Sequence, residues 1–135
     1  MSAARAVLDS FALLAFLRGE PGEETIASLL ERAGVRDEPV HMSEVNYAEV
    51  KYITIREDGK ERWDEIAGEL PALPIEFHPA TRALSDIAAE FKARYSISLA
   101  DAFAAALAKE RKAQLITGDP EFKALEKEIK IGWLE

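Results

Sequence analysis

Two aspartates stand just after apolar segments that we predict to be buried strands. Asp9 follows residues 4–8, and Asp119 follows residues 114–117 with one glycine between. The carboxyl ends of parallel strands face the crevice in which open α/β sheets bind their ligands. Each aspartate alone could simply cap the helix that follows it. Two such acids on neighbouring strands are harder to explain by capping, because they bring negative charge together at one edge of a sheet.

A third carboxylate interrupts the most apolar helix that the sequence predicts. Asp101 lies within residues 99–108, which are otherwise mainly alanine and leucine. Burying an unpaired charge there costs several kcal/mol. The helix dipole favours an acid in the first turn by about 1 kcal/mol, so a dipole interaction is one explanation of Asp101. A metal ligand that points into a crevice is the other.

The fourth carboxylate, Glu49, breaks an apolar face of a predicted helix. At helical spacing its face also carries three other residues: Val45, Ala48 and Tyr52. Glu44 belongs to the same helix but lies off this face, so we expect it to be solvated. A functional role is therefore favoured for Glu49 and not for Glu44.

Acids gathered without basic partners repel one another, and some of them would stay protonated. A hard divalent cation removes this repulsion, and Mg²⁺ and Mn²⁺ take oxygen ligands while keeping several waters. Such an ion lowers the pKa of a bound water and shields a phosphodiester, and two ions could stabilise both the attacking and the leaving oxygen. Thr117 and Ser10 add hydroxyls that could orient a ligand or water, or could cap turns and helices. The sequence thus predicts a cation site formed by Asp9, Glu49, Asp101 and Asp119.

Composition excludes several other kinds of site. The 135 residues include no cysteine, so disulfides, zinc–thiolate sites, iron–sulfur ligation and cysteine nucleophiles are absent. His41 and His78 are the only histidines, too few for a multi-histidine cage or an H-E-x-x-H protease. No apolar run approaches the roughly 20 residues of a membrane span, and the first acid comes too early for a signal peptide. We therefore expect a cytoplasmic domain.

The net charge of −8, from 17 basic and 25 acidic residues, is unusual for a protein that binds nucleic acid. Solubility alone explains such a charge in most acidic proteins. Bound cations would let an acidic chain handle an acidic polymer, because the metal supplies the missing positive charge.

Short apolar strands alternate with helices along the chain. The predicted strands are residues 4–8, 39–42, 75–77, 114–117 and 129–134. The predicted helices are residues 10–17, 23–32 (ended by Gly34), 43–56, 60–70, a helix that begins near Pro79, 99–112 (capped by Ser98) and 121–127. This alternation is typical of a parallel sheet covered by helices. We predict a single α/β domain over residues 1–135, a three-layer α/β/α sandwich with a mostly parallel sheet.

The four acidic segments, in this order, resemble the motifs of PIN domains. They are residues 6–10 (AVLDS), 46–50 (NYAEV), 98–108 (SLADAFAAALA) and 115–122 (LITGDPEF), followed by an apolar tail at residues 129–134. Each motif is loose, but the ordered set spans nearly the whole chain. Length and layout are most similar to the VapC-type toxins of toxin–antitoxin pairs.

The resemblance implies a Mg²⁺- or Mn²⁺-dependent endoribonuclease in which a metal-activated water cuts RNA. It implies Asp9, Glu49, Asp101 and Asp119 as the acidic quartet, with Thr117 as an accessory residue. It also implies a homodimer and a cognate antitoxin whose C-terminal segment occludes the site. Structured RNA such as tRNA is the substrate class that the resemblance suggests.

Two other functions stay open at the level of sequence. One is a catalytically silent PIN-like module that binds RNA or protein. The other is a phosphate-handling α/β domain with Asp9 as nucleophile. Ser10 and Phe11 follow Asp9 where such a domain would have a second acid, and the chain has no glycine-rich phosphate loop.

Overall fold

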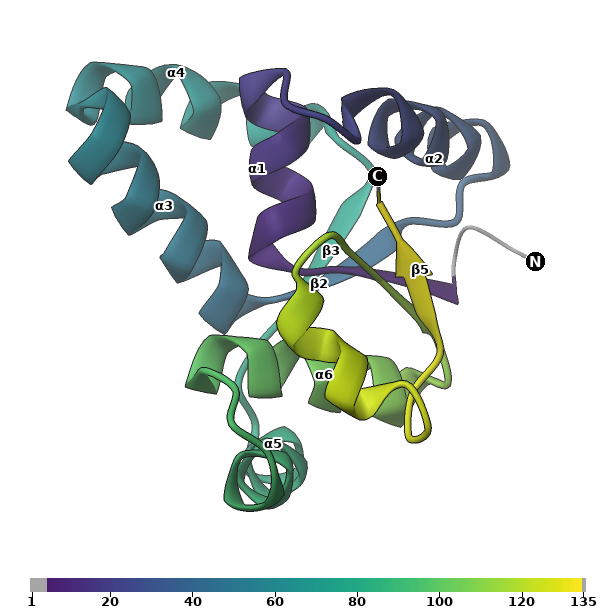
Figure 1. The fold of residues 1–135 in the computed structure, drawn as a ribbon. Coiled ribbons are helices and arrows are strands. Elements are labelled where there is room, and N and C mark those ends of the chain that lie inside the picture. Colours follow the sequence, from purple (N-terminus) through teal and green to yellow (C-terminus); the bar gives the residue numbers. More distant parts are fainter. Residues whose placement is uncertain (1–4, 135) are drawn as a thin grey trace.

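The central sheet of the computed structural model contains five strands that all run parallel (Figure 1). The structure describes residues 5–134. The strands are β1 (Ala6–Leu8), β2 (Val40–Ser43), β3 (Ile75–His78), β4 (Gln114–Thr117) and β5 (Ile131–Trp133), in the order β3-β2-β1-β4-β5. The predicted α/β class and parallel sheet are confirmed. Residue 4 of the first predicted strand lies outside the described part.

Six α-helices and two short 3₁₀ helices connect the strands within residues 5–134. They are α1 (Ser10–Arg18), α2 (Glu23–Arg36), α3 (Glu44–Asp58), α4 (Lys60–Glu69), η2 (Leu70–Ala72), α5 (Arg82–Arg94), α6 (Leu99–Arg111) and η3 (Pro120–Leu125). Side-chain oxygens cap four of the α-helices: those of Asp9, Ser43, Thr81 and Ser98. Each cap accepts a hydrogen bond from an N–H of the first turn that would otherwise lack a partner. None of these helices is long and apolar enough to span a bilayer.

Helices cover both faces of the sheet, as a three-layer sandwich requires (Figure 1). Val7 and Leu115 of adjacent strands pack on α5 and α6. Leu8 and Ile116 point to the opposite face and pack with residues of α1 and α2. A third cluster packs α1, α3 and α4 together, with Trp63 buried inside it. Successive side chains of β1 and β4 therefore point to opposite faces of the sheet and pack into two separate apolar layers.

Several element boundaries differ from those predicted, most clearly those of α2, η3 and β5. Helix α2 continues through Gly34 to Arg36 and ends at Asp37, whose φ of 54° is left-handed. A glycine within a helix weakens it without necessarily ending it. The predicted helix at 121–127 is the 3₁₀ helix η3, and the last strand shortens to Ile131–Trp133. Both η3 and β5 are short. Such segments are held mainly by tertiary packing, so the local sequence pattern determines their bounds poorly.

Leu8 tests the layered core because it is fully buried between β1 and the helices. We expect Leu8→Ala to lower the free energy of unfolding by about 2–5 kcal/mol, since it removes apolar contacts and leaves a cavity. Urea denaturation followed by circular dichroism measures this loss. The matched control is Val35→Ala, because Val35 is 83% exposed and should change stability by less than about 0.5 kcal/mol. Equal effects of the two substitutions would contradict this packing.

Candidate functional site

The acidic residues gather where the strand order reverses. The chain goes from β1 outward to β2 and β3, and then returns to place β4 on the other side of β1. Loops that leave β1 and β4 therefore diverge, which opens a crevice at the carboxyl ends of these strands. Asp9 follows β1 and Asp119 follows β4, so the two acids lie on neighbouring strands.

Asp9 is nearly inaccessible, and both of its carboxyl oxygens are held. One oxygen accepts a hydrogen bond from the Ala12 N–H at 2.8 Å and so caps α1, and the other accepts from the Thr117 hydroxyl at 2.5 Å. The pKa of Asp9 is raised to about 7. Burial is the largest cause, and the charges of Asp101 and Asp119 act in the same direction, while the two hydrogen bonds oppose the rise. Capping and charge clustering therefore coexist at this residue.

Thr117 connects the two aspartates. Its hydroxyl donates to Asp9 and accepts a hydrogen bond from the Asp119 N–H at 3.0 Å. Asp119 in turn caps η3, because its Oδ1 accepts from the Glu121 N–H at 2.9 Å. The ends of β1 and β4 are thus joined through a buried hydroxyl, which sets the position of both acidic loops.

Asp101 enters the same crevice from the first turn of α6. The Ser98 hydroxyl caps this helix by accepting from the Asp101 N–H at 3.0 Å. Burial raises the pKa of Asp101 to about 6, and Asp119 is the next largest cause; Glu49 and Glu121 add to it, while Ser98 opposes it. Carboxylates from η3, α3 and α6 therefore act on one another.

Glu49 lies on α3, half-buried, but not on the face that the spacing predicted. Ala48 and Tyr52 are exposed, and the buried residues of α3 are Asn46, Val50 and Thr54. The predicted face was wrong because two polar residues, Asn46 and Thr54, occupy the core side. Glu49 nevertheless acts on Asp101, whereas Glu44 is exposed and is not among the charges that do.

Sequence reasoning missed two residues of the site. Glu121 fell within a predicted helix and the motif at residues 115–122 but was given no role, yet its carboxylate lies within 4.8 Å of those of Asp101 and Asp119. Asn46 was included only as the first residue of the motif at residues 46–50, with no role assigned to it. Its buried amide donates to the Ser10 hydroxyl at 3.1 Å and to the Ala100 carbonyl at 3.2 Å.

The Asn46 contacts tie α1, α3 and α6 together beside the acids. Ser10 donates back to the Asn46 carbonyl at 3.3 Å, so its hydroxyl is engaged within the protein. One signal in the sequence pointed to Asn46: a polar residue one turn into a helix, close to an acidic motif. Only the tertiary contacts show that its side chain faces inward.

The donor set fits a hard divalent cation. Carboxylates converge from four elements, and within residues 5–134 none of Asp9, Glu49, Asp101, Asp119 and Glu121 has a basic partner at ion-pair distance. The raised pKa values of Asp9 and Asp101 are the cost of this arrangement. An all-oxygen, anionic set suits Mg²⁺ or Mn²⁺ better than a soft metal ion.

Comparison with family models gives one match, a PIN domain model over residues 6–128. The chain belongs to the PIN domain family. The matched segment contains every acidic residue of the crevice. A search of curated protein sequences gives no significant match to this PIN domain.

Solved structures share the fold of this PIN domain at low sequence identity. VapBC from Salmonella typhimurium, solved with bound DNA, has a TM-score of 0.75 at 16% identity over 95% of this chain and 96% of its own. VapBC2 from Rickettsia felis, bound to a promoter DNA fragment, has a TM-score of 0.72 at 14% identity over 96% and 98%. VapC20 from Mycobacterium tuberculosis is described as a sarcin–ricin loop cleaving toxin. It has a TM-score of 0.68 at 18% identity over 88% of this chain and 93% of its own.

The raised pKa values predict how the stability of the metal-free PIN domain depends on pH. Asp9 and Asp101 hold their protons to about pH 7 and 6 when folded, against 3.8 when unfolded. The folded state therefore binds more protons in this interval, and the free energy of unfolding falls as pH rises from about 4 to 7. Urea denaturation in EDTA across this range measures the fall, which we expect to be smaller in Asp9→Asn.

Glu31→Gln serves as the control for this pH dependence, because Glu31 is exposed on α2, which packs on the opposite face of the sheet from α6. It should leave the slope of stability against pH unchanged. Mg²⁺ should raise stability most at the high-pH end, where the carboxylates are charged. A slope that is the same in Asp9→Asn and the parent protein would contradict the assignment to Asp9.

Proposed function

We propose that this PIN domain is a metal-dependent endoribonuclease that hydrolyses RNA phosphodiesters. Asp9, Glu49, Asp101 and Asp119 would hold Mg²⁺ or Mn²⁺, and Thr117 would position Asp9. The observation that carries the proposal is the convergence of these carboxylates, without a basic partner in the described chain, where the strand order reverses. When bound, the ion lowers the pKa of a water and screens the phosphodiester charge.

Each protein group then has a distinct task. The Thr117 hydroxyl and the Ala12 N–H fix the orientation of Asp9, so its carboxylate enters the site already ordered. Asp101 and Asp119 approach from α6 and from the loop after β4, and Glu49 completes the set from α3. Glu121 adds a further carboxylate near Asp101 and Asp119. The combined negative field favours a cation and disfavours free RNA without one.

The biological setting that we propose is a toxin–antitoxin pair in the cytoplasm. Support comes from the match in fold to VapBC complexes, in which a PIN-domain chain is solved with its partner. A cognate antitoxin, a homodimer and a structured RNA substrate such as tRNA are all parts of this proposal. The description of VapC20 as a toxin that cleaves the sarcin–ricin loop favours structured RNA as the class to test first.

The two alternatives make different demands on the site. A silent binding module needs no metal, and turnover in the presence of Mg²⁺ separates it from a nuclease. A phosphoaspartate on Asp9 would have to accommodate a whole phosphoryl group on a side chain that is 1% exposed and whose two oxygens already accept hydrogen bonds. A metal ion needs only one remaining lone pair of such an oxygen, so this geometry favours the ligand role over the nucleophile.

The decisive experiment compares two glutamates of the same helix. We expect Glu49→Gln and Asp101→Asn each to lower the rate of RNA cleavage by at least about 100-fold, since each removes a proposed ligand. Glu44→Gln is the matched control and should retain the parent rate, because Glu44 is exposed at the start of α3. Cleavage of total cellular RNA in Mg²⁺, Mn²⁺ and EDTA measures the effect.

Folded protein, free of antitoxin, that cleaves no RNA with either ion would favour the binding module. Cleavage that persists in EDTA or in Asp101→Asn would refute the proposed site.

Thr117→Val tests the positioning role of the buried hydroxyl. The substitution keeps the shape of the side chain but removes the hydrogen bond to Asp9, so we expect Mn²⁺ affinity to fall about 10- to 100-fold. Thr117→Ser retains the hydroxyl and should keep most of the affinity. Isothermal titration with Mn²⁺ measures both. Equal affinities of the valine and parent proteins would remove Thr117 from the proposed site.

A further inference from the structure

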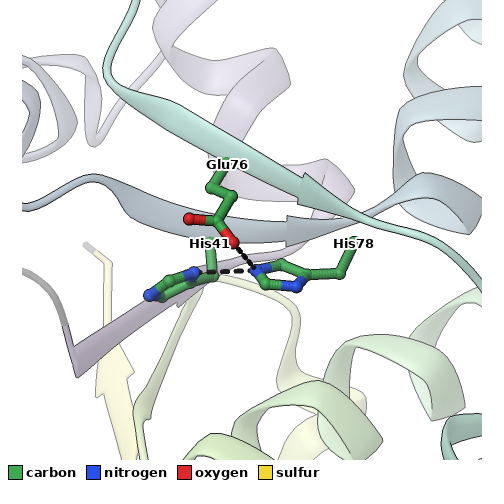
Figure 2. A group of neighbouring side chains, drawn as sticks. All are labelled: His41, Glu76 and His78. Atoms are coloured by element: carbon green, nitrogen blue, oxygen red, sulfur yellow. Dashed lines mark hydrogen bonds and ion pairs between the residues drawn. The ribbon is translucent and has the colours of Figure 1, made fainter.

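A second group of possible metal ligands lies away from the acidic crevice, on β2 and β3 (Figure 2). It consists of His41, Glu76 and His78, and one ligand atom from each lies within 4.8 Å of the other two. In the parallel register His41 is opposite Glu76, and His78 is two residues further along the same strand. Residues two apart on a strand point to the same face, so the register itself brings the three side chains together.

Two of the contacts meet at a single atom. His78 Nε2 lies 2.8 Å from His41 Nδ1 and 3.3 Å from Glu76 Oε2. Figure 2 marks both contacts with dashed lines. These contacts are all satisfied when His78 Nε2 carries the proton, because its N–H is then shared by the other two atoms. A proton thus occupies the position toward which two nitrogens and a carboxylate oxygen converge.

Two of the three ligand separations are close to those around a bound zinc ion. Ligands of a tetrahedral zinc ion at about 2.0–2.1 Å lie about 3.3 Å apart. The separation of His78 from Glu76 already has this value, and the two histidine nitrogens would move apart by about 0.5 Å. Exposure differs along the set: the Glu76 side chain is 53% exposed and that of His78 14%. Rotation of Glu76 would therefore meet little steric resistance.

Two of the three proposed ligands, His41 and Glu76, line a cleft that is open to solvent. A cleft of about 630 Å³ is lined by His41 and Glu76, together with Asp37, Glu38, Arg5 and Arg111 among others. Three of these residues are acidic and two are basic, and Glu110 adds a further negative charge that acts on His78. Burial and Arg111 lower the pKa of His78, which keeps its ring in the neutral form that binds metals.

We propose that His41, Glu76 and His78 form a second metal site, which takes a divalent transition-metal ion such as Zn²⁺ rather than Mg²⁺. Two imidazoles and one carboxylate are a donor set of borderline softness, unlike the all-carboxylate crevice. The two histidines are too few for a cage of histidines alone, and Glu76 supplies the third ligand. The ion would link the edge strand β3 to β2.

The proposed site is separate from the acidic crevice. Asp101 lies in the first turn of α6, while Arg111, which acts on His78, is the last residue of that helix. Ten residues of helix span about 15 Å. Binding at the histidines can therefore be tested without the ribonuclease activity, and a failure of either proposal leaves the other intact.

The test uses the full chain without affinity-tag histidines, in the Asp101→Asn background and with Mg²⁺ present, so that Zn²⁺ at the acidic crevice is suppressed. NMR of the imidazole nitrogens follows a Zn²⁺ titration. The protein contains two histidines, so both rings should shift together at one equivalent of metal. We also expect the Tm to rise by about 5–10 °C at a hundredfold excess over Kd.

Two variants at proposed ligands and one matched control test the assignment. His78→Gln should weaken Zn²⁺ binding at least 100-fold, and Glu76→Gln, at an exposed position that does not threaten folding, about 10- to 100-fold. Glu110→Gln is the matched control, because it removes a charge that acts on His78 without removing a ligand, and it should change affinity little. Rings that do not respond to excess Zn²⁺, or equal losses in Glu76→Gln and Glu110→Gln, would overturn the proposal.

Discussion

The hydrogen bond between the Thr117 hydroxyl and the buried carboxyl of Asp9 is the contact on which the acidic crevice depends. It joins β1 to β4 at the point where the strand order reverses, and the same hydroxyl holds the Asp119 backbone. Asp9 in turn caps α1. Through this one hydrogen bond, Thr117 and Asp9 link the start of α1, the ends of β1 and β4, and the loop that carries Asp119.

This arrangement keeps carboxylates close together in a buried site, which disfavours their ionised forms and lowers the stability of the metal-free fold at neutral pH. Burial raises the pKa of Asp9 and Asp101, and the neighbouring carboxylates raise it further. The rest of the fold offsets this cost through two apolar layers on opposite faces of the sheet and through the Asn46 hydrogen bonds that tie α3 to both α1 and α6. Stability given up at functional sites is commonly offset in this way by the rest of a fold.

The two clusters of possible metal ligands differ in chemistry because they lie on different parts of the sheet. At the carboxyl ends of β1 and β4, loops and helix starts bring together carboxylates that suit a hard cation. On β2 and β3, the register pairs His41 with Glu76 and places His78 beside them. The first cluster depends on where the strands end, and the second depends on how two strands align.

Local sequence was sufficient for the parallel α/β class, the positions of the strands and the motifs that mark the PIN family, because apolar periodicity and caps act over a few residues. Asp9, Asp101 and Asp119 stood out for the same reason: each is an acid within or just after an apolar segment. The buried side of α3, the approach of Glu121 and the inward turn of Asn46 could not be predicted this way. The meeting of His41 with Glu76 and His78 likewise joins residues 35 to 37 positions apart. Such contacts depend on strand order and register, which only the packing of distant segments decides.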